Sequence, residues 1–237
     1  MTMEKALLLS HATAGGLTLL SGLLASFVGA KGGKLHRFVG NVFFWSMSWI
    51  FVSALLIVAF VRFNFFLTFI AVFSFYMTFS GVRVLKIKKT MKPLKIDWIA
   101  AIITVLFGLT LLIFGIRVFI VNPSNSGFGI LCLVFGFFTA NTAWLNIKGF
   151  RRANNQEKMW WWFAHMNLMG GSFIASITAF LVQNGRLFTF IGDYGWVLWL
   201  LPAAIGSPLI AYWAKRYRQQ FGIGKHAKLE KAQNSVL

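Results

Sequence analysis

Seven long runs of apolar residues constrain the fold of this chain more than any other feature of its sequence. A helix needs about 20 consecutive, mainly apolar residues to cross a bilayer. Each of the seven runs reaches that length, and short segments containing basic or polar residues separate them. The predicted spans cover residues 6–30, 38–61, 64–85, 97–120, 128–147, 160–184 and 194–213.

The low content of charged residues excludes an ordinary soluble domain. Charged residues make up 12% of the 237 residues and hydrophobic residues 58%, whereas a soluble domain carries roughly 25% charged residues. Apolar surface must therefore face lipid. We predict an all-α polytopic membrane protein, a bundle of seven transmembrane helices.

The distribution of the cations predicts how the bundle is oriented. The net charge of +18 would suggest a nucleic-acid partner in a soluble protein, but here the cations cluster between apolar runs, which is typical of the cytoplasmic side of a membrane protein. Nucleic acid is therefore not an expected partner. With the N-terminus outside and the C-terminus in the cytoplasm, nineteen of the 23 Lys and Arg residues lie inside. We expect a seven-helix domain over 1–214 and a basic cytoplasmic tail over 215–237.

Small and hydroxyl residues recur at helical spacing in several spans, which predicts close helix packing. Examples are Gly108 with Gly115 in the fourth span and Gly136 with Ala140 in the fifth. A substrate path lined by Ser and Thr is the alternative interpretation. The prolines at 202 and 208 interrupt the seventh span, which indicates either a kink or a broken helix whose freed carbonyls could bind an ion.

The intramembrane histidines are the strongest site candidates, because ionisable side chains are expensive in a bilayer. His36 and His165 are both predicted near the cytoplasmic face, where two neutral imidazoles could bind a haem iron axially or form part of a metal site. His11 is predicted near the outer face, roughly 20 Å away in depth. The alternative is that His36 lies at the interface and that His11 and His165 form hydrogen bonds across helices.

Further intramembrane polar candidates are Asp97, Asn141 and Asn167. Asp97 and Asn167 are predicted on the same side as His36 and His165, where a carboxylate could orient one imidazole. No nucleophile elbow, phosphate-binding glycine loop or zinc motif is readable, and Cys132 stands alone. The sequence therefore assigns no catalytic or metal-binding residue, and haem b is the cofactor that we consider.

Short motifs spread along most of the chain carry a resemblance to a protein family. The most specific is His165-x3-Met169 followed by 171-GSFIA-175. The others are His11-x3-Gly15, His36-Arg37-x2-Gly40, Phe75-Tyr76 with Gly81 and Arg83, Asp97-Trp98, Phe135-Gly136, 178-TAF-180, and Pro202 with 206-GSPLI-210. With these motifs the chain resembles uncharacterised bacterial multi-pass membrane proteins of unknown function. The resemblance implies a multi-pass protein of the bacterial cytoplasmic (inner) membrane and implies no activity.

Three functions stay open at this level. The leading hypothesis is a membrane protein that holds a haem or a metal near the cytoplasmic face through His36 and His165, in a redox role. The second is a carrier or channel for a small solute, and the third is a structural or assembly protein without a ligand. The expected partners are the lipid bilayer and either further copies of the chain or another membrane protein.

Overall fold

The computed structural model describes residues 2–90, 92–152 and 156–223 of the chain. In this part the chain is helical apart from short connections and has no strand, which confirms the predicted all-α class. The helices are α1 (Met3–Phe27), α2 (Lys34–Phe60), α3 (Phe65–Thr90), α4 (Lys95–Val121), η1 (Pro123–Asn125), α5 (Ser126–Arg151), α6 (Trp160–Gln183), η3 (Gly185–Trp199) and α7 (Leu201–Gln220).

Seven helical segments within the described residues are long and apolar enough to span a membrane, as the sequence predicts. Several helices extend beyond the predicted spans. The α2 helix begins at Lys34, α3 continues to Thr90, and α7 continues to Gln220. The extensions carry Lys and Arg residues, whose long side chains can keep their charge in water while the backbone stays helical. The basic segment from residue 215 therefore begins as the last turns of α7, and residues 224–237 lie outside the described part.

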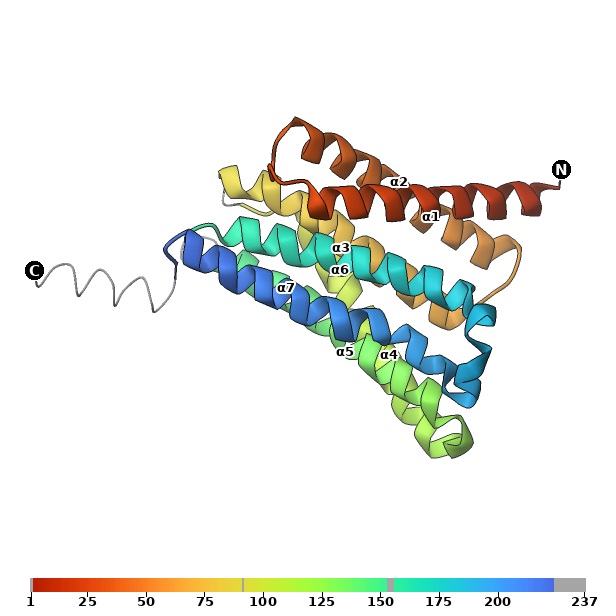
Figure 1. Cartoon of the computed structure of the whole chain (residues 1–237). Coiled ribbons are helices and arrows are strands. Elements are labelled where there is room, and N and C mark those ends of the chain that lie inside the picture. Colours follow the sequence, from red (N-terminus) through yellow and green to blue (C-terminus); the bar gives the residue numbers. More distant parts are fainter. Residues whose placement is uncertain (1, 91, 153–155, 224–237) are drawn as a thin grey trace, which may run out of the picture.

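The α3 and α6 helices form the centre of the bundle. The α1 and α2 helices cover one side of this pair, α4 and α5 pack on the other side through α3, and α7 packs on α6 (Figure 1). Successive helices run in opposite directions, so α1 begins and α7 ends at opposite ends of the bundle. Thr78 and Ser172 join the central pair through their buried hydroxyl groups, whose oxygens lie 2.5 Å apart.

The α4 and α5 helices are packed at backbone contact. A Cβ atom on Gly108 would lie 2.5 Å from the Ala140 nitrogen, and one on Gly136 would lie 2.9 Å from the Gly108 oxygen. The small-residue stripes of these two spans thus serve helix packing, as predicted.

The predicted seventh span changes from 3₁₀ to α geometry just before Pro202, and α7 then runs through Pro208 without a break. The irregular 3₁₀ segment η3 ends at Trp199, and α7 begins at Leu201 with Pro202 in its first turn. Proline is favoured in the first turn, where its missing N–H is not needed. Pro208 lies inside α7, where it cannot donate to the carbonyl of Ala204.

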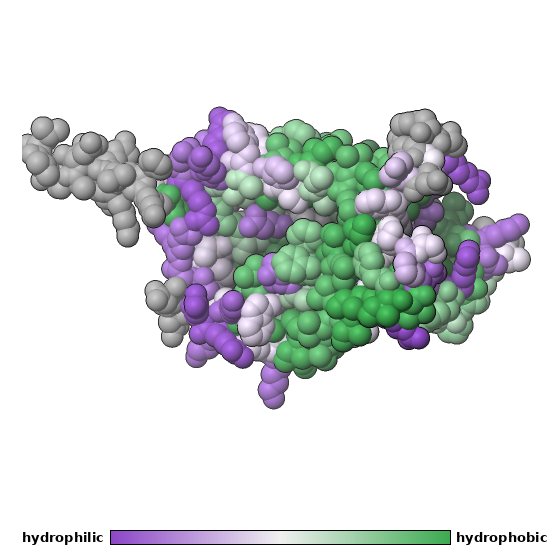
Figure 2. All heavy atoms as spheres, turned by 90° about the horizontal axis from the view of Figure 1, so that it is seen from below, coloured by the Kyte–Doolittle hydropathy of each residue, from purple (hydrophilic) through white to green (hydrophobic). Residues whose placement is uncertain are grey.

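Polar and basic residues gather at the two ends of the molecule, and an apolar belt lies between them (Figure 2). The α3, α5 and α7 helices all finish at one end and carry cations in their last turns: Lys88 and Lys89, Lys148 and Arg151, and Arg218. Positive charge is favourable there because the carbonyls of a helix C-terminus carry partial negative charge. We call this the basic end of the bundle.

Candidate functional site

The structure brings His36 and His165 together. His36 lies in the first turn of α2 and His165 in the second turn of α6, so both rings are at the basic end. Their ring centres are 6.3 Å apart and their planes are inclined by 73°. The pair thus joins two helices that are far apart in the sequence.

A backbone carbonyl fixes the orientation of His165. Its Nδ1 atom lies 2.7 Å from the carbonyl oxygen of Gly81 on α3. A carbonyl oxygen can only accept a hydrogen bond, so Nδ1 carries the proton, and in the neutral ring Nε2 keeps its lone pair. Histidines that bind metals are commonly held by such a bond from their other nitrogen.

His36 carries a buried nitrogen without a partner. Its Nδ1 atom makes no hydrogen bond of regular geometry within the described part of the chain, although the ring lies against the Ala25 backbone, and only the Thr18 hydroxyl shares that state among buried side-chain polar atoms there. Most buried polar atoms in proteins are satisfied, so this exception requires an explanation. A ligand bound by the imidazole pair would supply one.

Two cations lie near the histidine pair, Lys31 beside His36 and Lys88 beside His165. The Lys31 ammonium donates to the carbonyls of Ala25 and Ser26 at the end of α1. The Lys88 ammonium lies 3.6 Å from the ring centre of Trp161, a cation–π contact between α3 and α6. The pair therefore lies in an electropositive region that would favour an anionic group on a bound ligand.

His11 belongs to a separate contact near the other end of the bundle. Its Nδ1 atom lies 2.8 Å from the hydroxyl oxygen of Ser53 on α2. His36 and Ser53 are 17 residues apart on that helix, or about 25 Å along its axis. Both His11 and His165 thus form hydrogen bonds across helices, as the alternative interpretation of the sequence predicts.

Asp97 forms an ion pair and does not orient a histidine. Its two carboxylate oxygens accept from the Nε and Nη2 atoms of Arg83 at 2.7 and 2.8 Å. The backbone N–H of Leu94 also donates to this carboxylate, which fixes the start of α4. Asn141 is half-buried on α5, and Asn167 faces a cavity on the side of α6 that points away from the histidine pair.

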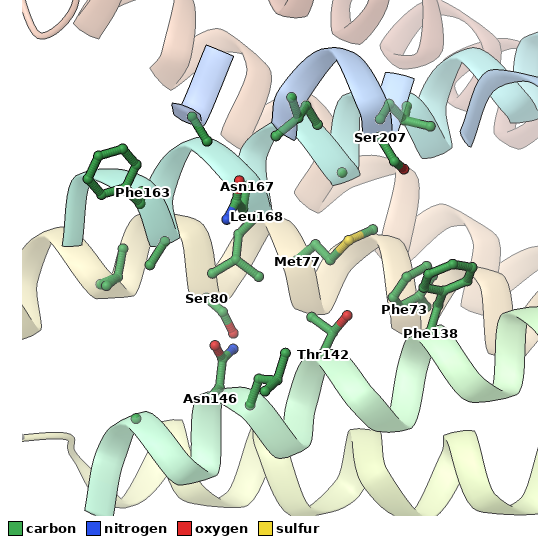
Figure 3. Close-up of a pocket in the computed structure, with 18 of the residues that line it drawn as sticks. Phe73, Met77, Ser80, Phe138, Thr142, Asn146, Phe163, Asn167, Leu168 and Ser207 are labelled. Atoms are coloured by element: carbon green, nitrogen blue, oxygen red, sulfur yellow. The ribbon is translucent and has the colours of Figure 1, made fainter. Parts of the chain in front are cut away.

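That cavity has a volume of about 920 Å³ and lies between α3, α5, α6 and α7. Ser80, Thr142, Asn146 and Asn167 extend into it from three helices, and Ser207 reaches it from α7 (Figure 3). The Asn146 amide donates to the Tyr76 hydroxyl, which leaves the amide oxygen free to accept. One wall of the cavity is α6, so this helix separates the cavity from His165.

The sequence did not single out Gly81, Ser80 or Asn146 for a ligand site. Asn146 could have been noticed, because an amide inside an apolar run is costly to bury without a partner. Gly81 and Ser80 carry no such signal, since a backbone carbonyl and a lone serine occur in most membrane helices.

Comparison with known proteins adds no relative. No protein-family model, no curated protein and no solved structure matches this chain.

Proposed function

We propose that the protein is a multi-pass protein of the bacterial cytoplasmic membrane that binds one b-type haem through His36 and His165. The observation that carries the proposal is the imidazole pair at the basic end, with ring centres 6.3 Å apart. Two imidazoles that bind opposite sides of one metal at about 2 Å have ring centres roughly 6 Å apart. The spacing therefore suits a shared iron.

The number of protein donors favours haem over a bare metal ion. A structural zinc site uses four protein ligands and a catalytic one three. Within the described ranges, no cluster of three or more His, Cys, Asp or Glu residues could hold a metal. A porphyrin brings its own four nitrogens, so its iron needs only two axial ligands from the chain.

The chain's own residues supply orientation and charge. The Gly81 carbonyl holds the His165 ring so that Nε2 is the free nitrogen. The unpartnered His36 nitrogen would be the second donor atom from the chain. Lys31 and Lys88 lie where they could pair with the haem carboxylates. A haem bound there would provide single-electron redox chemistry.

A visible spectrum of the purified protein tests the proposal. Protein from haem-replete cells is expected to show the reduced-minus-oxidised difference of a b-type haem. The His36→Ala and His165→Ala variants should each lose it, since each removes one axial ligand. His11→Ala is the matched control: it removes an intramembrane imidazole about 25 Å away along the bundle, and should keep the full spectrum.

A flat spectrum from well-folded, haem-replete protein would contradict haem binding, as would a spectrum that survives in both His36→Ala and His165→Ala. Metal analysis of the same samples distinguishes bound haem from a metal ion bound without a porphyrin. In that case, a stoichiometric metal lost in both variants would accompany the flat spectrum.

We also propose that the basic end faces the cytoplasm. Proteins of the bacterial membrane keep Lys and Arg on that side, and the basic last turns of α3, α5 and α7 share it. The Lys5→Cys and Arg218→Cys variants test this with a membrane-impermeant thiol reagent, because the native Cys132 that both variants keep is fully buried. In intact spheroplasts, the Lys5→Cys variant should react with the reagent. The Arg218→Cys variant should react only after the spheroplasts are lysed. The reverse pattern would contradict the orientation.

A further inference from the structure

Three aromatic rings, those of Phe66, Phe135 and Trp199, meet at the end of the cavity away from the basic end, and two of them, Phe135 and Trp199, line it. The centres of Phe66 and Trp199 are 5.2 Å apart, those of Phe66 and Phe135 are 5.8 Å apart, and those of Phe135 and Trp199 are 6.1 Å apart. Each ring contacts both others, nearly edge to face, which is a favourable aromatic geometry.

The residues that line the cavity change from mostly apolar at one end to more polar toward the basic end. Near these rings most of the lining side chains are apolar, among them Phe73, Ile174 and Ala175. Toward the basic end, Ser80 and Asn146 approach each other from α3 and α5, and Asn167 lines the same cavity from α6, beside Leu168 (Figure 3). The polar part therefore offers uncharged donors and acceptors from three helices.

The charged residues at the inner rim are largely neutralised. Arg83 pairs with Asp97, and Arg218 pairs with Glu157 while its guanidinium lies 4.4 Å from the ring centre of Phe163. Lys215 also reaches the rim, where it is exposed. The two pairs offer little net field to an ionic ligand, and water screens the charge of the exposed Lys215, so the polar interior of the cavity favours an uncharged head group.

The cavity opens sideways toward the bilayer. On α5, the lining residues Phe138 and Leu145 are 46% and 55% exposed. Across from them on α7, Ser207 lines the cavity and is exposed as well. These residues lie on the membrane-spanning part of both helices, so the opening faces acyl chains rather than water.

We infer that this cavity binds an uncharged amphiphile from the bilayer. Its compact head carries oxygens that bond to Asn167, Asn146 and Ser80, and its apolar chain passes out between α5 and α7. An isoprenoid quinone and a neutral glycerolipid both have this chemistry. The inference does not depend on haem, because α6 separates the cavity from the histidine pair.

Binding to the purified full chain in nanodiscs tests the inference. The probes are a short-chain benzoquinone, detected by quenching of tryptophan fluorescence, and a medium-chain diacylglycerol, detected by thermal stabilisation. We expect saturable binding of one of them. Asn167→Leu should weaken binding by up to about tenfold, the loss of one hydrogen bond to the head group. Asn141→Leu, which removes a half-buried amide outside the cavity, should leave the affinity unchanged.

A second pair of variants tests the location. Ala203→Trp fills the cavity from α7 and should abolish binding, whereas Ala204→Trp places the same ring on the exposed side of the same turn and should preserve it. Binding of the quinone assigns the site to quinones, and binding of the glycerolipid assigns it to lipids. Failure of both probes to bind the parent chain, or equal binding to the Ala203→Trp and Ala204→Trp variants, would overturn the inference. Neither variant should alter the haem spectrum, so the two proposals fail separately.

Discussion

Replacing Asp97 with alanine is expected to lower the free energy of unfolding by about 3–5 kcal/mol, the typical cost of breaking a buried ion pair from one side. The Asp97 side chain is 1% exposed and that of Arg83 is 15% exposed. Removal of the carboxylate leaves the Arg83 guanidinium in a poorly solvated place without its bidentate partner. It also removes the acceptor for the Leu94 N–H at the start of α4.

A double-mutant cycle separates the pair from its surroundings. Arg83→Ala should cost a similar amount, because it leaves the carboxylate buried and unpaired, and the Arg83→Ala/Asp97→Ala chain should cost clearly less than the sum of the two single changes. Lys86→Ala, which removes an exposed cation from the same helix, is the control and should have little effect. Unfolding in mixed micelles with increasing denaturing detergent provides the measurement. Additive single effects would show that the two charges do not interact.

The number and class of the helices could be predicted because lipid imposes a strict length and composition on each span. The ends were less predictable. Hydropathy marks where the chain enters lipid, whereas the helix continues as long as backbone bonds and snorkelling side chains allow. This is why α3 runs five residues past the predicted end, to Thr90, and why α2 begins at Lys34.

The sequence predicts only that His36 and His165 lie at the same depth in the membrane, not that their rings are in contact. Hydropathy places His36 and His165 at one face of the membrane, but which helices adjoin there depends on how the bundle packs. The contact follows from the central position of α6 beside α3 and α1. The Gly81 carbonyl that holds His165 is invisible in the sequence, because every residue carries such a group.

For Arg83, counting charges predicts the side of the membrane but not the contact that its side chain makes. Counted among the cations of the inner side, it supports the topology, yet its side chain turns back to pair with Asp97 across the short connection between α3 and α4. The cavity was also unpredictable, because Ser80, Asn146 and Asn167 belong to three helices and only the folded bundle directs them into one space.

Replacing Gly108 with alanine is expected to destabilise the protein by about 1–3 kcal/mol, the usual cost of overpacking a tight contact. Alanine is the better helix former by about 1 kcal/mol, so helix propensity alone predicts the opposite sign. The contact decides, because a Cβ at this position would lie 2.5 Å from a backbone nitrogen and 2.8 Å from the Cβ of Ala140. Backbone atoms cannot move aside without separating α4 from α5.

Gly16→Ala provides the matched comparison, since a Cβ there meets nothing within 4 Å. It lies within α1, so the same substitution should be neutral or stabilising by up to about 1 kcal/mol. Both variants are measured by the same detergent titration as the Asp97 series. If Gly108→Ala were as stable as Gly16→Ala, α4 and α5 could not be packed at backbone contact, and the packing role of the small-residue stripe would be wrong. If Gly108→Ala lowers the free energy of unfolding and Gly16→Ala raises it, the close approach of α4 and α5, and not helix propensity, explains the glycine at position 108.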